Sequence, residues 1–210
     1  MLITEIRPEK GHLVGLYTDG EHIVSLDSDL AAECRLKPMT EYPVGALQEM
    51  LTQSQLRRAK SKALYLLEFR DYSRRDMVMR LKKDFDEPSA EAAADYLEDI
   101  GALDDARYAE NIIRHLISGK HYGRRRILQE LAQKGIDRRT AEAALETFDH
   151  SETDEIRSLL EGKFARNLDD PKDIRRTVAS LLRYGYSQSD IFDALRDYAA
   201  HRDDTDESDE

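Results

Sequence analysis

A repeat with a period of about 50 residues runs through this chain of 210 residues. Residues 122–136 read Tyr-Gly-Arg-Arg-Arg-Ile-Leu-Gln-Glu-Leu-Ala-Gln-Lys-Gly-Ile, and related segments stand at 72–85 and 174–186. The positions that align include Arg75, Arg125 and Arg175, and Leu81, Leu131 and Leu181. A period of this length is typical of stacked helical units, in which each unit buries its apolar side against its neighbours.

Each repeat is predicted to contain three helices, because apolar residues recur at helical spacing from about residue 57 onward. The expected helices span 57–70, 74–84 and 89–100, then 105–118, 124–134 and 138–148, and finally 152–165, 172–184 and 188–199. Candidate N-caps precede several of them: Ser73, Asp86, Asp137 and Ser187. Gly101, Gly135 and Gly185 follow helix ends, where a left-handed residue is favoured.

The N-terminal part has a different pattern, with short runs rich in β-branched residues at 2–6, 12–17 and 22–26. Asp19-Gly20 between the last two predicts a tight hairpin. Two helical pieces, 30–35 and 44–56, follow, and the second is expected to cover one face of the small sheet.

The predicted fold class is therefore mainly α: a tandem array of three three-helix, helix-turn-helix-like repeats with a small N-terminal β-hairpin or αβ domain. The expected domains are a β-rich accessory domain at 1–56, repeats at 57–104, 105–149 and 150–200, and a disordered acidic tail at 201–210.

Charge is distributed in blocks of alternating sign, although the whole chain carries a formal net charge of -11. Residues 57–83 sum to +7, residues 84–110 to -9 and residues 114–139 to +6. This asymmetry indicates a polyanionic or charge-patterned partner, whereas the simpler alternative is a set of solvated helix faces.

Nothing in the sequence indicates catalysis, a metal site or another cofactor. The chain has one cysteine, Cys34, scattered histidines and no glycine-rich phosphate loop. Asp104 and Asp105 are expected to complement the dipole at the start of a helix rather than to act as acid and base. The absence of an apolar span and of an N-terminal signal predicts a soluble cytoplasmic protein that does not enter a membrane.

The openings of the middle helices in the first two repeats combine tyrosine with arginine. Guanidinium groups beside an aromatic ring suit the recognition of phosphate or carboxylate. The candidate partner-binding residues are Arg74, Arg75, Lys120, Tyr122, Arg124, Arg125 and Arg126. Because cations oppose the dipole at a helix N-terminus, they require a compensating partner. That partner is either external or an internal acid such as Asp104, Asp105 or Glu110.

A resemblance to a known family rests on three motifs taken together. Leu-Asp-Asp-x-Arg-Tyr-Ala at 103–109, Tyr-Gly-x-x-Arg-Ile at 122–127 and Lys-Gly-Ile at 134–136 resemble the RecX family of bacterial recombination regulators. The motif positions given a structural role are Asp104, Asp105, Arg107, Tyr108, Gly123 and Gly135. The sequence departs from the family pattern in two places. Asp84 stands where the later repeats have glycine, and the chain carries an acidic tail.

The resemblance implies a monomeric regulator that binds the RecA recombinase filament along its groove, with single- or double-stranded DNA as a further partner. It also implies damping of the filament's ATPase, strand-exchange and coprotease activities without covalent chemistry. The alternative that the residues leave open is a DNA-binding regulator whose middle helix enters a major groove. A third alternative is a nuclease that uses the acidic residues Asp99, Asp104 and Asp105.

Overall fold

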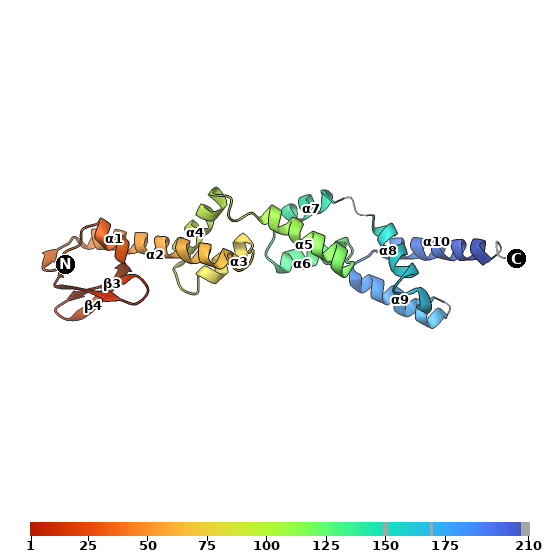
Figure 1. Cartoon of the computed structure of the whole chain (residues 1–210), viewed down its shortest axis with the longest axis horizontal. Coiled ribbons are helices and arrows are strands. Elements are labelled where there is room, and N and C mark those ends of the chain that lie inside the picture. Colours follow the sequence, from red (N-terminus) through yellow and green to blue (C-terminus); the bar gives the residue numbers. More distant parts are fainter. Residues whose placement is uncertain (149–150, 169, 207–210) are drawn as a thin grey trace. The chain divides into compact units, whose positions relative to one another are not determined.

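The computed structural model describes residues 1–148, 151–168 and 170–206. The chain divides after Asp104 into two compact units; among the described residues the strands lie in the first, and the second is helical (Figure 1). The mainly α fold with three-helix repeats and a small N-terminal strand region is confirmed.

The first unit begins with five short strands: β1 (Leu2–Ile3), β2 (Glu5–Glu9), β3 (Leu13–Thr18), β4 (Glu21–Asp27) and β5 (Thr40–Glu41). β2, β3 and β4 form an antiparallel sheet, and β1 pairs with β5. The hairpin predicted at Asp19-Gly20 is confirmed, because both residues are left-handed, with φ of 50° and 86°.

Two helices follow β4 and border this sheet: α1 (Ser28–Glu33) and α2 (Val44–Leu67). Leu47 of α2 shares a buried cluster with Leu16 and Leu26 of the sheet, so α2 covers the sheet as expected. The hydroxyl of Ser54 accepts a hydrogen bond of 2.7 Å from the backbone amide of Asp27.

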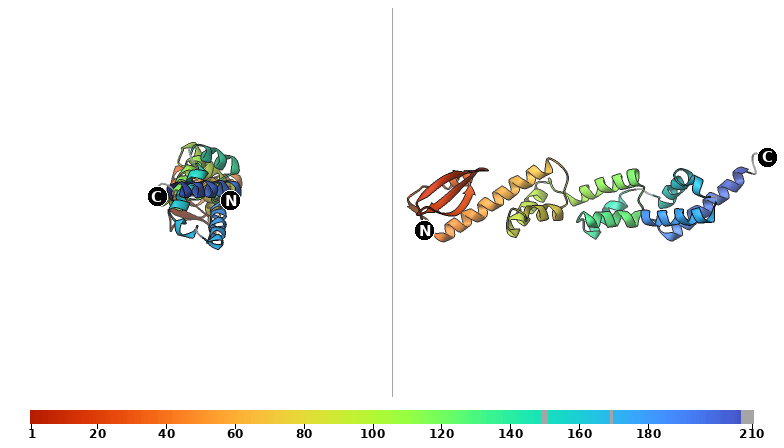
Figure 2. Two further views of the ribbon diagram at one scale, coloured as in Figure 1. Left: turned by 90° about the vertical axis from the view of Figure 1, so that its right-hand side faces the viewer. Right: turned by 90° about the horizontal axis from the view of Figure 1, so that it is seen from below.

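The helix break expected at residue 56 is absent, because α2 runs through this position without interruption. Figure 2 shows this helix passing from the strands to the next pair of helices. No proline or glycine interrupts the chain between 46 and 67, and Ala, Leu, Gln, Arg and Lys dominate there. The separate pieces predicted at 44–56 and 57–70 are thus one helix.

The first repeat is completed by α3 (Arg74–Leu81) and α4 (Glu87–Asp99). Alanines of α2 and α4 lie fully buried in its core, where small side chains allow the two helices to approach closely. α3 ends without a left-handed residue at Asp84, which differs from the later repeats as expected.

The second unit holds two further repeats. The helices are α5 (Asp105–Lys120), α6 (Arg124–Gln133), α7 (Arg138–Glu146), α8 (Glu152–Glu161), the 3-10 turn η1 (Ala165–Asn167), α9 (Pro171–Tyr184) and α10 (Gln188–Asp206). Each repeat has its own buried cluster, and the aligned residues Leu81, Leu131 and Leu181 are all fully buried.

The helix ends follow the local signals. Ser73, Asp86 and Asp137 accept hydrogen bonds from the first turns of α3, α4 and α7. Gly135 and Gly185 are left-handed, as predicted.

Helix α10 is longer than expected and extends to Asp206, into the segment predicted to be disordered. Once a helix is nucleated, adding residues costs little, even where their propensity is low. The rest of the predicted tail, 207–210, lies outside the described residues.

Candidate functional site

The first turn of α3 separates two neighbouring arginines that the sequence could not distinguish. Ser73 caps this helix by accepting a hydrogen bond of 3.1 Å from the backbone amide of Asp76. Arg74 then faces α4, whereas Arg75 is exposed. Consecutive helical residues point about 100° apart, so one of the pair can be buried in contacts while the other meets solvent.

Arg74 is held by an acidic face of α4. Its guanidinium pairs with Glu91 at 2.9 Å, with Glu98 at 3.1 Å and with Asp95. The hydrogen bond to Asp95 and those to the two glutamates raise the pKa of Arg74. For this residue the geometry favours the internal pairing that the sequence left open, and acids of α4 are among its partners.

The first turn of α6 is capped by the following repeat instead of by its own N-cap residue. Gly123 has no side chain to serve as a cap. A carboxylate oxygen of Glu152, at the start of α8, accepts a hydrogen bond of 2.5 Å from the backbone amide of Arg124. The backbone amide of Gly123 donates to the carbonyl oxygen of Tyr184 across 2.9 Å. An anion thus stands where the helix dipole requires one, despite three arginines in the first turn.

The three arginines that open α6 have different environments. Arg124 and Arg125 are exposed. Arg126 turns back along the helix and pairs with Glu130 at 2.6 Å, and its guanidinium lies 5.5 Å from the ring centre of Tyr122. Lys120, the last residue of α5, is exposed beside this turn. The candidate surface of the second repeat is therefore Lys120, Arg124 and Arg125.

Tyr122 belongs to the junction between the second and third repeats rather than to the open surface. It is half-buried, and its ring lies 5.9 Å from that of Tyr184. The hydroxyl of the buried Tyr186 donates to the carbonyl oxygen of His121 at 2.9 Å. The side chain of His121 also contacts the carboxylate of Glu155.

The sequence reasoning missed the residues of the third repeat that complete this junction: Glu152, Glu155, Gly185 and Tyr186. In the repeat, Gly185 and Tyr186 align with Gly135 and Ile136, and the sequence predicted for the two glycines only that they follow a helix end. That alignment contained no signal that Gly185 and Tyr186 also contact the preceding repeat, because the contact from Tyr186 joins positions 65 residues apart.

The predicted structural residues of the second repeat occupy its first helix and a turn. Asp105 is the acidic residue in the first turn of α5, where it complements the dipole. Tyr108 packs against the repeat's core. Asp104 and Arg107 lie exposed beside them, and both have interaction partners. Gly135 has a φ of 83° after α6.

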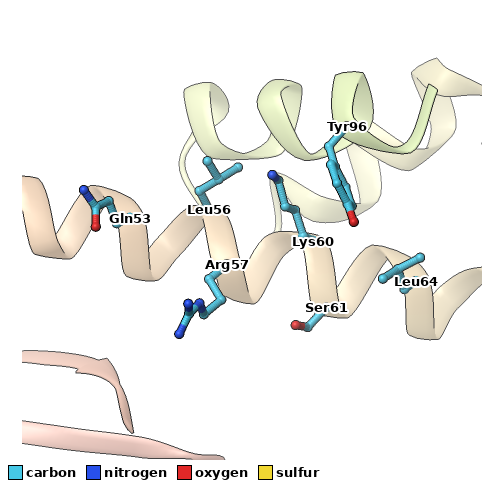
Figure 3. Close-up of a pocket in the computed structure, with 7 residues that line it drawn as sticks. All are labelled: Gln53, Leu56, Arg57, Lys60, Ser61, Leu64 and Tyr96. Atoms are coloured by element: carbon cyan, nitrogen blue, oxygen red, sulfur yellow. The ribbon is translucent and has the colours of Figure 1, made fainter. Parts of the chain in front are cut away.

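Two open hollows lie beside these elements. One, of about 330 Å3, lies between α2 and α4 and is lined by Gln53, Leu56, Arg57, Lys60, Ser61, Leu64 and Tyr96 (Figure 3). Its cations are engaged: Lys60 lies 4.0 Å from the ring centre of Tyr96, and Arg57 pairs with Glu33 at 2.9 Å. The other, of about 490 Å3, lies between α5 and α7 and includes Glu110 and Arg139.

Across residues 1–148, 151–168 and 170–206, no three His, Cys, Asp or Glu side chains are grouped as they would be around a metal ion. In that same part of the chain no helix combines the length and apolarity needed to cross a membrane.

The fold and the exposed cations on its middle helices define a helical-repeat protein with a basic surface in each repeat. Comparison with known proteins identifies the family to which the chain belongs. Residues 59–97 match the family model for the first three-helix domain of RecX. Residues 104–145 match the family model for the second three-helix domain of RecX. Regulatory protein RecX of Xanthomonas axonopodis pv. citri is 36% identical over 139 residues, which cover 64% of this chain and 84% of that protein. The chain belongs to the RecX family of regulatory proteins.

More distant relatives extend the match along the chain. Regulatory protein RecX of Clostridioides difficile is 27% identical over 194 residues, or 90% of this chain and 92% of that protein. A solved structure, "Crystal structure of regulatory protein RecX", shares the fold with a TM-score of 0.67 at 24% identity, over 93% of this chain and 98% of that one.

Proposed function

We propose that this protein binds the RecA recombinase filament on DNA in the cytoplasm and inhibits its ATPase, strand-exchange and coprotease activities. In this proposal it is a regulator without catalytic chemistry of its own. Membership of a family of regulatory proteins supports the proposal, as do the three motifs at 103–109, 122–127 and 134–136.

Three aligned and exposed arginines support the choice of contact residues. Arg75, Arg125 and Arg175 occupy aligned positions in α3, α6 and α9, and all three are exposed. Their neighbours Arg74 and Arg126 are held in ion pairs. A chain with a net charge of -11 thus presents one outward guanidinium at the same place in each repeat. A filament is itself a repeating surface, and such a series suits carboxylates or phosphates that recur along it.

The deciding experiment measures the ATPase rate of a RecA filament on single-stranded DNA during titration with this protein. Inhibition well below one copy per recombinase protomer is expected. A variant in which Arg75, Arg125 and Arg175 are replaced by Gln should raise the half-inhibitory concentration about tenfold or more, since loss of charged contacts is costly at an interface.

A matched control separates position from total charge. Arg114, Arg166 and Arg196 are also exposed, and their replacement by Gln changes the net charge by the same amount. This control should inhibit like the wild type. An equal loss in both variants would refute the assignment of contacts. Absence of inhibition together with salt-sensitive binding to duplex DNA would instead favour the helix-turn-helix alternative.

A further inference from the structure

Helix α2 carries a stripe of basic and aromatic side chains along one side. Arg58, Lys62, Tyr65 and Phe69 follow the spacing i, i+4, i+7 and i+11, which places them along one side of a helix. Ala59, Ala63 and Leu66, on another side, are buried in the core of the first repeat. Phe69 lies just beyond the helix end, where its backbone amide donates to the carbonyl oxygen of Leu66.

The two aromatic rings of the stripe are unusually open for large apolar side chains. Phe69 is 69% exposed and Tyr65 is 52% exposed. The rings contact each other edge to face, with centres 4.9 Å apart. These two exposed rings, in edge-to-face contact, form a small apolar platform.

Lys62 lies beside one ring of this platform, and further basic residues stand near it in the sequence. The ammonium of Lys62 lies 5.7 Å from the ring centre of Tyr65, and the guanidinium of Arg58 lies 5.6 Å from that of Phe85. Between Arg57 and Arg70 the sequence holds five basic residues and a single acid, Glu68. The ligand that this surface favours is therefore an anion that also presents flat apolar faces.

We propose that the α2 stripe, defined as Arg58, Lys62, Tyr65 and Phe69, binds single-stranded nucleic acid by stacking bases on Tyr65 and Phe69. Unpaired bases expose the faces that aromatic rings can stack against, while lysine and arginine contact the phosphates. Duplex nucleic acid hides those faces within its stack, so it can use only the charges of the stripe. An acidic protein surface would likewise leave the two rings without a matching partner.

This inference rests on the proposed function only in placing the chain on a filament that contains DNA. Binding is measured without recombinase, so the two proposals can fail separately. The probe is a fluorescein-labelled oligonucleotide of about 20 thymidines, and a duplex of the same length is the comparison. Fluorescence anisotropy at low salt gives both affinities, since a large part of such binding is electrostatic.

The test variant is Tyr65→Ser with Phe69→Ser, and the control is Met79→Ser with Ile100→Ser. Met79 and Ile100 are exposed by 58% and 51% in the same unit, so the control removes similar apolar surface elsewhere. The stripe variant should bind the single strand about a hundredfold more weakly, or about tenfold for each ring. Its duplex affinity and the control's affinities should stay at wild-type values.

A second readout reports stacking directly. The chain has no tryptophan, so Phe69→Trp introduces a single reporter into the platform. Its fluorescence should be quenched by the single strand and not by the duplex. Unchanged fluorescence with the single strand would overturn the proposal, as would equal losses for single strand and duplex in the serine variant. A serine variant that binds the oligonucleotide normally but no longer inhibits the recombinase would also overturn it, because the stripe would then contact protein.

Discussion

Gly123 and Gly185 lie back to back where the second and third repeats meet. A Cβ atom on Gly123 would stand 2.9 Å from the carbonyl carbon of Gly185, and one on Gly185 would stand 2.4 Å from the backbone nitrogen of Arg126. Real Cβ atoms do not approach backbone this closely. Gly185 is also left-handed, with a φ of 98°. The junction therefore depends on two missing side chains, one from each repeat.

Replacing Gly185 by Ala should destabilise the protein by roughly 2–4 kcal/mol, because the left-handed conformation and overpacking each contribute. Gly123→Ala should be destabilising through crowding alone, since its φ of -77° suits any residue. Urea denaturation followed by circular dichroism measures both changes.

Gly119 is the control for these two substitutions. It lies in α5, and a Cβ there would meet only the ring of His115 at 3.6 Å, an ordinary contact. Gly119→Ala should leave stability unchanged or raise it by about 0.5 kcal/mol, because glycine is a poor helix former. If Gly123→Ala behaved like Gly119→Ala, the close packing of the two repeats would be disproved.

The buried hydroxyl of Tyr186 makes the same junction sensitive to alkaline pH. Burial, and secondarily the charges of Glu155 and Glu152, raise the pKa of Tyr186 above its ordinary value. An unfolded tyrosine ionises near pH 10. The contribution of Tyr186 to the free energy of unfolding is therefore complete below about pH 10 and is lost as the pH rises further.

Tyr186→Phe should cost about 1 kcal/mol at pH 8, because the carbonyl oxygen of His121 loses its donor. The difference between wild type and variant should then shrink above pH 10, where only the wild type loses stability through this residue. The other nine tyrosines are common to both proteins and cancel in the comparison. A difference that stays constant from pH 8 to pH 11 would contradict the role assigned to the buried phenol.

Local signals predicted the elements of this fold well. The turn at Asp19-Gly20, the caps at Asp86 and Asp137 and the left-handed Gly135 each depend on residues within a few positions of one another. Their physical causes are therefore visible in short stretches of sequence. The aligned leucines that fill the three cores were also identifiable, because the period repeats them.

Contacts between distant segments were not predictable in the same way. Arg74 and Arg75 are adjacent and equally charged, yet Arg74 alone meets acids 17 to 24 positions away on α4. Gly123 belongs to a sequence motif, but the motif does not show why glycine is needed there. The need comes from the close approach of Gly185, about 60 positions later. Side-chain direction depends on where each helix begins, and an error of one residue there turns a side chain by about 100°.

The cap that Glu152 provides to α6 should be measurable as stability. Glu152→Ala removes the acceptor for the backbone amide of Arg124 and the charge that opposes three arginines, so a loss of about 1–2 kcal/mol is expected. Glu152→Gln keeps an acceptor oxygen but loses the charge, and it should cost less. If both variants unfolded at the wild-type urea concentration, the cap across the repeats would contribute nothing.

The adjacent arginines of α3 offer the sharpest separation of folding from binding. Arg74→Gln breaks ion pairs with three acids of α4 and should lower stability by about 1–2 kcal/mol, since exposed pairs contribute up to about 1 kcal/mol each and a network somewhat more. Arg75→Gln removes an exposed charge and should leave the urea midpoint unchanged.

The two variants should rank the other way round for function. The measurement is inhibition of the RecA ATPase at a temperature where both variants are folded. Arg75→Gln should then inhibit more weakly than the wild type, whereas Arg74→Gln should inhibit normally. The two variants carry the same net charge, so a difference between them cannot come from overall electrostatics. Normal inhibition by Arg75→Gln would remove α3 from the proposed contact surface, because Arg75 is the outward guanidinium that the first repeat contributes to the aligned series.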